Sequence, residues 1–314
     1  MFIEQGIKKS NEFWKYILGS ILVIGASTLG QIPLGMAVAF KSLKSGKIPK
    51  DTNAAINLLD SNLSLFLIML SFVFGFIGLV LVVKYFHKQT ILEVTTSRKK
   101  IDWSRVFFSF ILWALFTILI TIITYYANPG ELVWNFKPIP FAILFVIATV
   151  LIPIQTTTEE FIFRGYLMQG FANLSMNKWF PLVMTSVIFG SMHILNPEVG
   201  KLGYVVLVYY IGTGLFLGIL TLMDEGMELS LGFHAANNLI TALLVTSDWT
   251  ALRTNSIFKD TSIPGGVLEI FIPVLVVYPI LLYTFSRKYH WTNWKDKLTG
   301  NITLDNNLKE KHHD

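Results

Sequence analysis

The sequence has no cysteine and few charged residues. The absence of cysteine excludes a disulfide framework, a thiolate metal site and a cysteine nucleophile. Charged residues make up 14% of the 314 residues, whereas an average soluble domain has about 25%. This composition disfavours a soluble globular fold. Any chemistry that the chain performs must use carboxylate, imidazole, amide or hydroxyl groups.

Long uncharged runs occupy much of the chain. Residues 16–40, 63–83, 106–126 and 202–223 contain no Asp, Glu, Lys or Arg. Each run can cross a hydrocarbon core of about 30 Å as a helix. Hydrophobicity that is continuous rather than alternating excludes a membrane β-barrel. We therefore predict an all-α, polytopic transmembrane helical bundle of about eight helices, from the apolar segments 16–40, 63–83, 106–126, 140–172, 180–195, 202–223, 229–246 and 265–285.

Ionisable residues inside apolar segments are few, and their cost in lipid makes each one a functional hypothesis. The fourth segment contains Glu159, Glu160 and Arg164. Glu160 and Arg164 are four residues apart on one helix face and can form an ion pair. Glu159 is rotated by about 100° and must find a partner on another helix. One fixed carboxylate beside one available carboxylate suits a general base, although a purely structural ion-pair cluster is an equal alternative on this pair alone.

Two histidines lie in later apolar segments. His193 ends the run Phe-Gly-Ser-Met-His, and His234 is four residues before Asn238, so these two share a helix face that Asn237 does not. A single wet pocket inside the bundle would offset the desolvation cost of all these polar groups. Such a pocket suits peptide hydrolysis by an activated water. Zinc held by two histidines and one glutamate is a competing hypothesis, but the sequence has no H-E-x-x-H motif.

The three motifs E-E-x-x-x-R, F-x-x-x-H and H-x-x-x-N, in this order over residues 140–246, resemble those of the CAAX protease and bacteriocin-processing (CPBP or Abi) family. The resemblance implies an eight-helix intramembrane endopeptidase. Because members of this family have been described both as metalloproteases and as glutamate-dependent proteases, the resemblance leaves zinc open, and we favour metal-free chemistry. The resemblance also implies a role for each motif residue. By this resemblance, Glu159 and His193 activate the water, and His234 and Asn238 form the oxyanion site. Glu160 and Arg164 organise the pocket.

The resemblance leaves the substrate and the biological role open. We predict a membrane-associated peptide or protein as the substrate, and a composition rich in Ile, Asn, Lys and Phe favours a bacterial peptide precursor over a prenylated protein. Two other hypotheses are a non-catalytic membrane scaffold or bacteriocin-immunity protein, and a transporter. Nucleic-acid binding is disfavoured because the basic residues lie in short loops between apolar runs. The sequence makes no prediction of the oligomeric state.

The expected organisation has four parts. Residues 1–139 supply three spans, residues 140–246 form the catalytic core, residues 247–286 form the last loop and span, and residues 287–314 form a polar tail. Lys and Arg number 17 on the side that carries both termini and 8 on the other. The positive-inside rule then places both termini in the cytoplasm of a multi-pass cell-membrane protein. We also predict one long helix from Pro140 to about Phe171, bent near Pro153.

Overall fold

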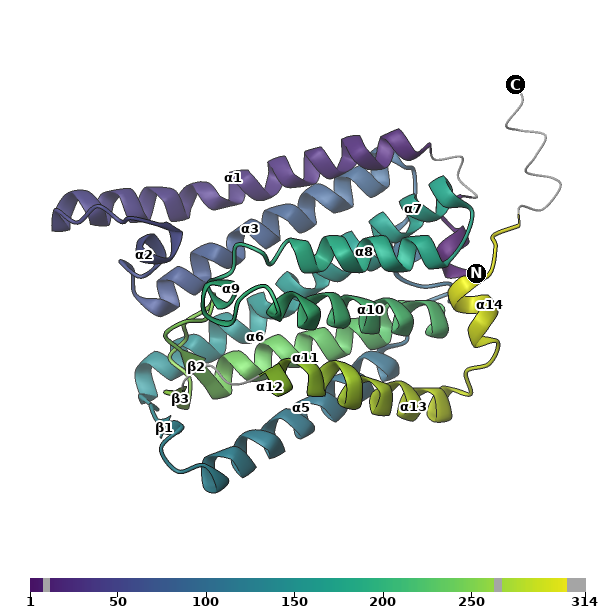
Figure 1. The fold of residues 1–314 in the computed structure, drawn as a ribbon. Helices are drawn as coiled ribbons and strands as arrows, with labels where there is room; N and C mark the ends of the chain where they lie inside the picture. Colours follow the sequence, from purple (N-terminus) through teal and green to yellow (C-terminus); the bar gives the residue numbers. More distant parts are fainter. Residues whose placement is uncertain (8–11, 263–266, 304–314) are drawn as a thin grey trace.

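The computed structural model describes residues 1–7, 12–262 and 267–303, and most of these residues belong to long helices that run lengthwise through one bundle (Figure 1). The predicted all-α class is confirmed. The α-helices are α1 (Phe13–Ser45), α2 (Thr52–Ile56), α3 (Ser61–Leu81), α4 (Ile91–Thr95), α5 (Trp103–Ala127), α6 (Pro138–Glu160), α7 (Met168–Ser175), α8 (Trp179–Ser191), α9 (Pro197–Leu202), α10 (Val206–Asp224), α11 (Glu228–Leu244), α12 (Val267–Ile272), α13 (Tyr278–Tyr289) and α14 (Trp294–Thr299). The strands are β1 (Leu132–Trp134), β2 (Val245–Ser247) and β3 (Phe258–Asp260). Short 3₁₀ or π-helical pieces are η1 (Phe2–Glu4), η2 (Val82–Phe86), η3 (Phe161–Leu167) and η4 (Pro273–Val277).

Each predicted apolar segment contains a helix, although residues 192–195 form a turn, residues 203–205 are not helical and residues 245–246 belong to β2. Within the described residues, six helical stretches are long and apolar enough to cross a membrane: Phe13–Ser45, Ser61–Phe86, Trp103–Ala127, Pro138–Ser175, Val206–Asp224 and Leu268–Tyr289. The predicted segments 180–195 and 229–246 form α8 and α11, which are shorter, with 13 and 17 residues. Residues 265 and 266, at the start of the last predicted segment, lie outside the described residues. The chain is a multi-pass membrane protein.

Polar residues mark where several spans begin. The Asp60 carboxylate accepts hydrogen bonds from the first backbone amides of α3, and Asp102 does the same for α5. Pro138 occupies the first position of α6, where its missing N–H costs nothing. Because lipid offers no hydrogen-bond partner to a free helix end, such caps belong at the membrane boundary.

Helix α11 lies at the centre of the packing. It contacts α5, α6 and α10, while α10 also packs on α8, and α1 packs on α3, which in turn packs on α6. A ring cluster of Phe216, Phe233 and Tyr278 fills the space between α10, α11 and α13, with Phe216 stacked on Tyr278 at 4.4 Å. Outward-facing residues such as Leu115 and Val146 are 62% and 65% exposed. In a membrane this apolar outer surface faces lipid.

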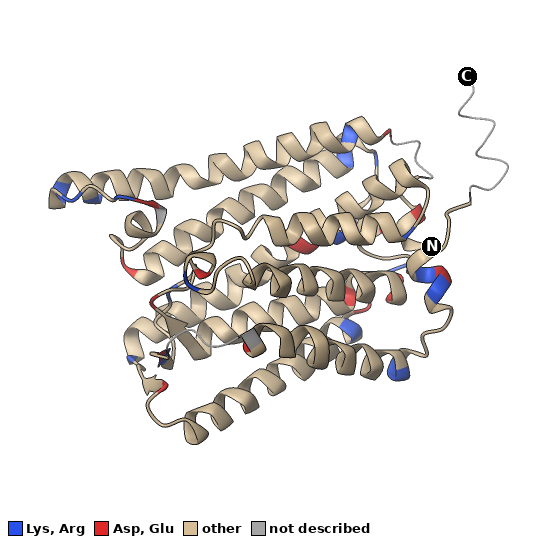
Figure 2. Ribbon diagram, in the orientation of Figure 1, with Lys and Arg blue, Asp and Glu red and all other residues tan. Residues whose placement is uncertain are grey.

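The two ends of the bundle differ. The N-terminal residues and α14 lie at one end, and the three-stranded sheet, ordered β1-β3-β2, lies at the other (Figure 1). In this sheet β1 pairs with β3 antiparallel and β2 pairs with β3 parallel. Charged residues gather mainly towards these two ends (Figure 2). The predicted polar tail begins inside α13, and its described part packs on the bundle, since Ile302 is buried; residues 304–314 lie outside the described residues.

One helical stretch is much longer than a bilayer requires. Helices α6, η3 and α7 join into a continuous stretch of 38 residues, Pro138–Ser175, which is about 57 Å long at 1.5 Å per residue. The predicted continuation past Arg164 to Phe171 is confirmed. The backbone changes to π-helical geometry at Phe161–Leu167, directly after the two glutamates, whereas Pro153 lies inside α6. π-Helical turns are rare and are frequently found at functional sites.

Candidate active site

The Glu160–Arg164 ion pair is buried at the junction of α6 and η3. The Arg164 Nη1 atom lies 3.1 Å from Glu160 Oε1, and both side chains are 0% exposed. Arg164 Nη2 also donates to the backbone oxygen of Gly214 on α10, and the guanidinium lies over the ring of Phe189. The predicted pairing four residues apart is confirmed. This pair ties the long helix to α8 and α10.

His234 on α11 lies between the two glutamates. Its Nδ1 atom is 2.7 Å from Glu160 Oε1, and its Nε2 atom is 3.4 Å from Glu159 Oε2. Glu159 therefore has its partner on another helix, as its rotation predicts. A neutral imidazole has one N–H, whereas two carboxylate oxygens face this ring. If the Nδ1–H donates to Glu160, the contact between Nε2 and Glu159 is a hydrogen bond only when a second proton lies on one of those two groups. We call Glu159, Glu160, Arg164 and His234 the diglutamate cluster.

Access distinguishes the two glutamates. The side chain of Glu159 is 16% exposed, whereas that of Glu160 is 0% exposed. Glu160 Oε1 accepts hydrogen bonds from both Arg164 and His234, and these bonds fix the position of the carboxylate. One carboxylate is thus held in place and the other remains within reach of a small molecule, which is the division that the motif predicts.

His193 is near the cluster but is not on a helix. Helix α8 ends at Ser191, and His193 lies in the following turn, so its predicted place in a helix spanning 180–195 is wrong. Its Nδ1 atom is 2.8 Å from the backbone oxygen of Phe189, and its ring stacks on Tyr210 at 4.1 Å. A carbonyl only accepts, so the Nδ1–H must donate and the lone pair of neutral His193 is at Nε2.

The ring of Phe189 is close to the rings of both histidines. It is 4.9 Å from the His193 ring and 6.1 Å from the His234 ring, measured between centroids. His193 is thus brought to the same region as the diglutamate cluster. The ring that directly contacts Glu159, however, is that of His234 and not that of His193.

Asn238 belongs to a row of side-chain hydrogen bonds that crosses three helices. Its Nδ2 atom donates to Gln155 Oε1 at 3.1 Å, and its Oδ1 atom accepts from Asn237 at 3.0 Å. Asn237 in turn accepts from the indole N–H of Trp113 on α5. Sequence reasoning missed Gln155 and Trp113. Gln155 could have been found, because it is four residues before Glu159 and shares its helix face.

Zinc held by two histidines and one glutamate stays a prediction. Within the described part of the chain, no group of three His, Asp or Glu side chains is placed to hold a metal ion. The two ring nitrogens of His234 are directed at carboxylates, and Nδ1 of His193 is engaged by the backbone oxygen of Phe189. A zinc site requires at least three protein ligands around one point.

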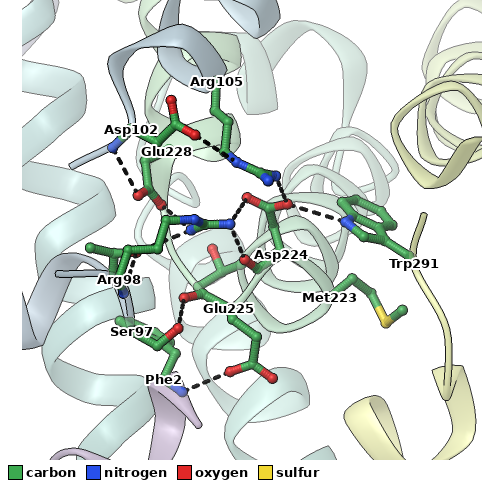
Figure 3. Close-up of polar contacts among 12 residues, drawn as sticks. Phe2, Ser97, Arg98, Asp102, Arg105, Met223, Asp224, Glu225, Glu228 and Trp291 are labelled. Atoms are coloured by element: carbon green, nitrogen blue, oxygen red, sulfur yellow. Dashed lines mark hydrogen bonds and ion pairs between the residues drawn. The ribbon is translucent and has the colours of Figure 1, made fainter. Parts of the chain in front are cut away.

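A second group of buried charges lies at the end of the bundle that carries the N-terminus. Figure 3 shows this end cluster, which comprises Arg98, Arg105, Asp224, Glu228 and Trp291. Arg98 forms 3.0 Å ion pairs with both Asp224 and Glu228. Arg105 and the indole N–H of Trp291 both donate to Asp224 Oδ1. Sequence reasoning missed the end cluster, because it treated Arg98 only as a contribution to the charge of a loop.

Comparison with known proteins bears directly on the segment that contains the diglutamate cluster. Residues 138–240 match the family model of "Type II CAAX prenyl endopeptidase Rce1-like". The chain is also 29% identical over 266 residues to "Uncharacterized protein YyaK" of Bacillus subtilis (strain 168), covering 84% of this chain and 85% of that protein. No solved structure matches the chain. The matched segment holds all six predicted site residues and is similar to this family of prenyl endopeptidases.

Proposed function

We propose that the chain is an intramembrane endopeptidase that adds water across a peptide bond of a membrane-associated protein or peptide. The single observation that carries this proposal is the division between the two glutamates. Glu160 is fully buried and held by two partners, whereas Glu159 is partly exposed and borders an imidazole. A carboxylate in this position can take a proton from water and later return it.

The proposed mechanism assigns each group one task. Glu159, assisted by the Nε2 lone pair of His193, takes a proton from a water molecule, and the oxygen of that water adds to the carbonyl carbon of the substrate. The N–H at Nε2 of His234 and the free N–H of the Asn238 amide then donate to the resulting oxyanion. The proton passes to the nitrogen of the leaving peptide, and the C–N bond breaks.

The Glu160–Arg164 pair supports this chemistry without touching the substrate. Glu160 accepts from the Nδ1–H of His234, which sets the orientation of the ring. The N–H at Nε2 requires the protonated ring, in which both nitrogens carry a hydrogen and which the two neighbouring carboxylates stabilise. Arg164 compensates the negative charge of Glu160 inside the bundle. The pair thereby directs Nε2 of His234 towards Glu159 and the reacting carbonyl.

The test is cleavage by the purified full chain in liposomes, offered a panel of membrane-anchored quenched peptides that includes a farnesylated CAAX peptide. We expect wild type to cleave a member of the panel and Glu159→Gln to lose at least about 10³-fold in kcat, since the base is removed while the shape is kept. Glu269→Gln is the matched control, because Glu269 is an exposed carboxylate at the start of the last span. Cleavage by the Glu159→Gln variant at the wild-type rate would reject the proposal.

Membrane orientation is a second part of the proposal. The N-terminal residues and α14 share one end of the bundle (Figure 1), and the Lys and Arg counts favour the cytoplasm for that end. A reporter that is active only in the cytoplasm, fused after residue 303, should be active. A silent reporter there, together with an active one inserted between β1 and α6, would reverse the assignment.

A further inference from the structure

Four side chains form a continuous row of hydrogen bonds from α5 through α11 to α6. Trp113 Nε1 donates to Asn237 Oδ1 at 3.1 Å, Asn237 Nδ2 donates to Asn238 Oδ1 at 3.0 Å, and Asn238 Nδ2 donates to Gln155 Oε1 at 3.1 Å. The row starts at a tryptophan that is 8% exposed and ends one helical turn before Glu159. We call these four residues the amide row.

The direction of the amide row follows from its first member. An indole N–H can only donate, so the atom of Asn237 that faces it must be the oxygen. The NH₂ group of Asn237 must then face Asn238, which presents its own oxygen in return. By the same logic Nδ2 of Asn238 faces Gln155, whose oxygen accepts. One donor thus determines the orientation of three amides that could each be reversed without a change in shape.

This direction decides what Asn238 offers to a substrate. With its oxygen engaged by Asn237, the amide presents its nitrogen on the other side, and one of the two Nδ2 hydrogens remains after the bond to Gln155. A reversed Asn238 would present an oxygen instead. An oxygen facing a developing oxyanion repels it, whereas an N–H stabilises it.

We propose that Trp113 and Asn237 are positioning residues that hold the Asn238 amide with its N–H towards the reacting carbonyl, and that Gln155 couples this amide to the helix of Glu159. The proposal rests on the proposed function, because it presumes that Asn238 serves the oxyanion. Gln155 and Glu159 share one face of α6, while His234 and Asn238 share one face of α11. The bond between Gln155 and Asn238 therefore keeps the general base and the oxyanion donor in register.

The first test is Trp113→Phe, which removes the N–H and keeps an aromatic ring beside Phe116 and Phe233. We expect kcat on the quenched peptide that wild type cleaves best to fall about fivefold, since one neutral hydrogen bond is worth about 1 kcal/mol, with KM unchanged. Asn237→Leu should give a similar loss by removing the donor to Asn238. It provides a second measurement if the phenylalanine variant fails to fold. Trp179→Phe is the matched control, because Trp179 is 49% exposed on α8.

A double-mutant cycle separates positioning from simple packing. Asn238→Ala alone should lower kcat by about 10²-fold, the usual cost of one oxyanion donor. If Trp113 acts through Asn238, then adding Trp113→Phe to Asn238→Ala should cause no further loss. A fivefold loss in both backgrounds would show that Trp113 supports packing only and would overturn the proposal.

The proposal and the proposed function can fail separately. If Glu159→Gln abolishes cleavage while Trp113→Phe and Asn237→Leu both keep the wild-type kcat, the positioning role is wrong and the peptidase assignment stands. If Glu159→Gln cleaves normally, both are wrong. If Trp113→Phe lowers kcat in the wild-type background and has no effect in the Asn238→Ala background, both the positioning role and the peptidase assignment are supported.

Discussion

The diglutamate cluster and the end cluster both bury carboxylates beside arginine, but they differ in how completely the charged atoms are bonded. In the end cluster every oxygen of Asp224 and Glu228 accepts a hydrogen bond from Arg98, Arg105, Trp291 or the amide of Asp102. In the diglutamate cluster, among the described residues, Glu160 Oε2 and Arg164 Nε are buried without a partner. Among the described residues, the Glu159 carboxylate has one close polar contact, 3.4 Å to Nε2 of His234.

This difference separates two uses of buried charge. A fully bonded network holds elements together, and the end cluster joins the loop before α5 to the junction of α10 and α11 and to Trp291. An incompletely bonded network costs stability, and proteins retain such costs where the open groups have a task. The comparison therefore supports a structural role for the end cluster and a chemical one for the diglutamate cluster.

The largest effect is expected from Arg164→Met, which leaves the buried charge of Glu160 without its cation. We expect the free energy of unfolding to fall by about 3–5 kcal/mol. We also expect cleavage to be lost, because an unpaired Glu160 no longer holds the His234 ring in place. Thermal unfolding in detergent and the liposome assay measure the two effects. The double variant Glu160→Gln with Arg164→Met removes both charges and should recover most of the stability. A double variant as unstable as the single one would show that the unpaired charge is not the cause.

A smaller effect is expected from Asp224→Asn in the end cluster. The carboxylate is buried, but Arg98 and Arg105 are 25% and 19% exposed and can partly recover water. We therefore expect a loss of about 2–3 kcal/mol, below the cost of a fully buried pair, with kcat of the folded protein within about twofold of wild type. Asp248→Asn, at a carboxylate 67% exposed whose partners Arg253 and Lys259 are each 34% exposed, should change stability by less than about 1 kcal/mol. A large loss of kcat at unchanged stability in Asp224→Asn would erase the distinction between the clusters.

What could be predicted from the sequence followed from local spacing. Apolar segment lengths predicted the helices, and the four-residue spacing of Glu160 and Arg164 predicted their ion pair, because both depend on the geometry of one helix. The shared face of His234 and Asn238 was predicted in the same way, and both side chains do face α6. The family resemblance was confirmed by the match over residues 138–240.

What could not be predicted depended on how helices pack. Spacing within α11 cannot tell that both ring nitrogens of His234 meet glutamates of α6. It also cannot tell that Arg98 reaches Asp224, because nothing local to either residue indicates the other. The position of His193 was wrong because apolarity continues past Ser191 while the helix does not. The polar side chain of Gln155 was overlooked because it is uncharged, although its spacing from Glu159 was informative.

The smallest effect concerns His87, a buried histidine outside both clusters that contacts Tyr166, two residues after Arg164. Burial, and then the nearby charge of Lys15, lower its pKa from 6.5 to about 4, and Nε2 bonds the Tyr166 hydroxyl at 2.8 Å. Between pH 6.5 and pH 4 the unfolded chain binds a proton at this residue that the folded chain does not. Stability is therefore complete above pH 6.5 and falls by up to about 1.4 kcal/mol per pH unit below it.

Thermal unfolding at pH 7.5 and pH 5.5 measures this loss, and His87→Gln should remove most of it while still reaching the tyrosine hydroxyl. The control is His290→Asn at an exposed histidine whose left-handed backbone, with φ of 54°, suits asparagine. It should keep the wild-type pH dependence. An equal acid loss in His87→Gln would assign the sensitivity to other groups, and the diglutamate cluster, with His234 between its carboxylates, would then be the first to examine.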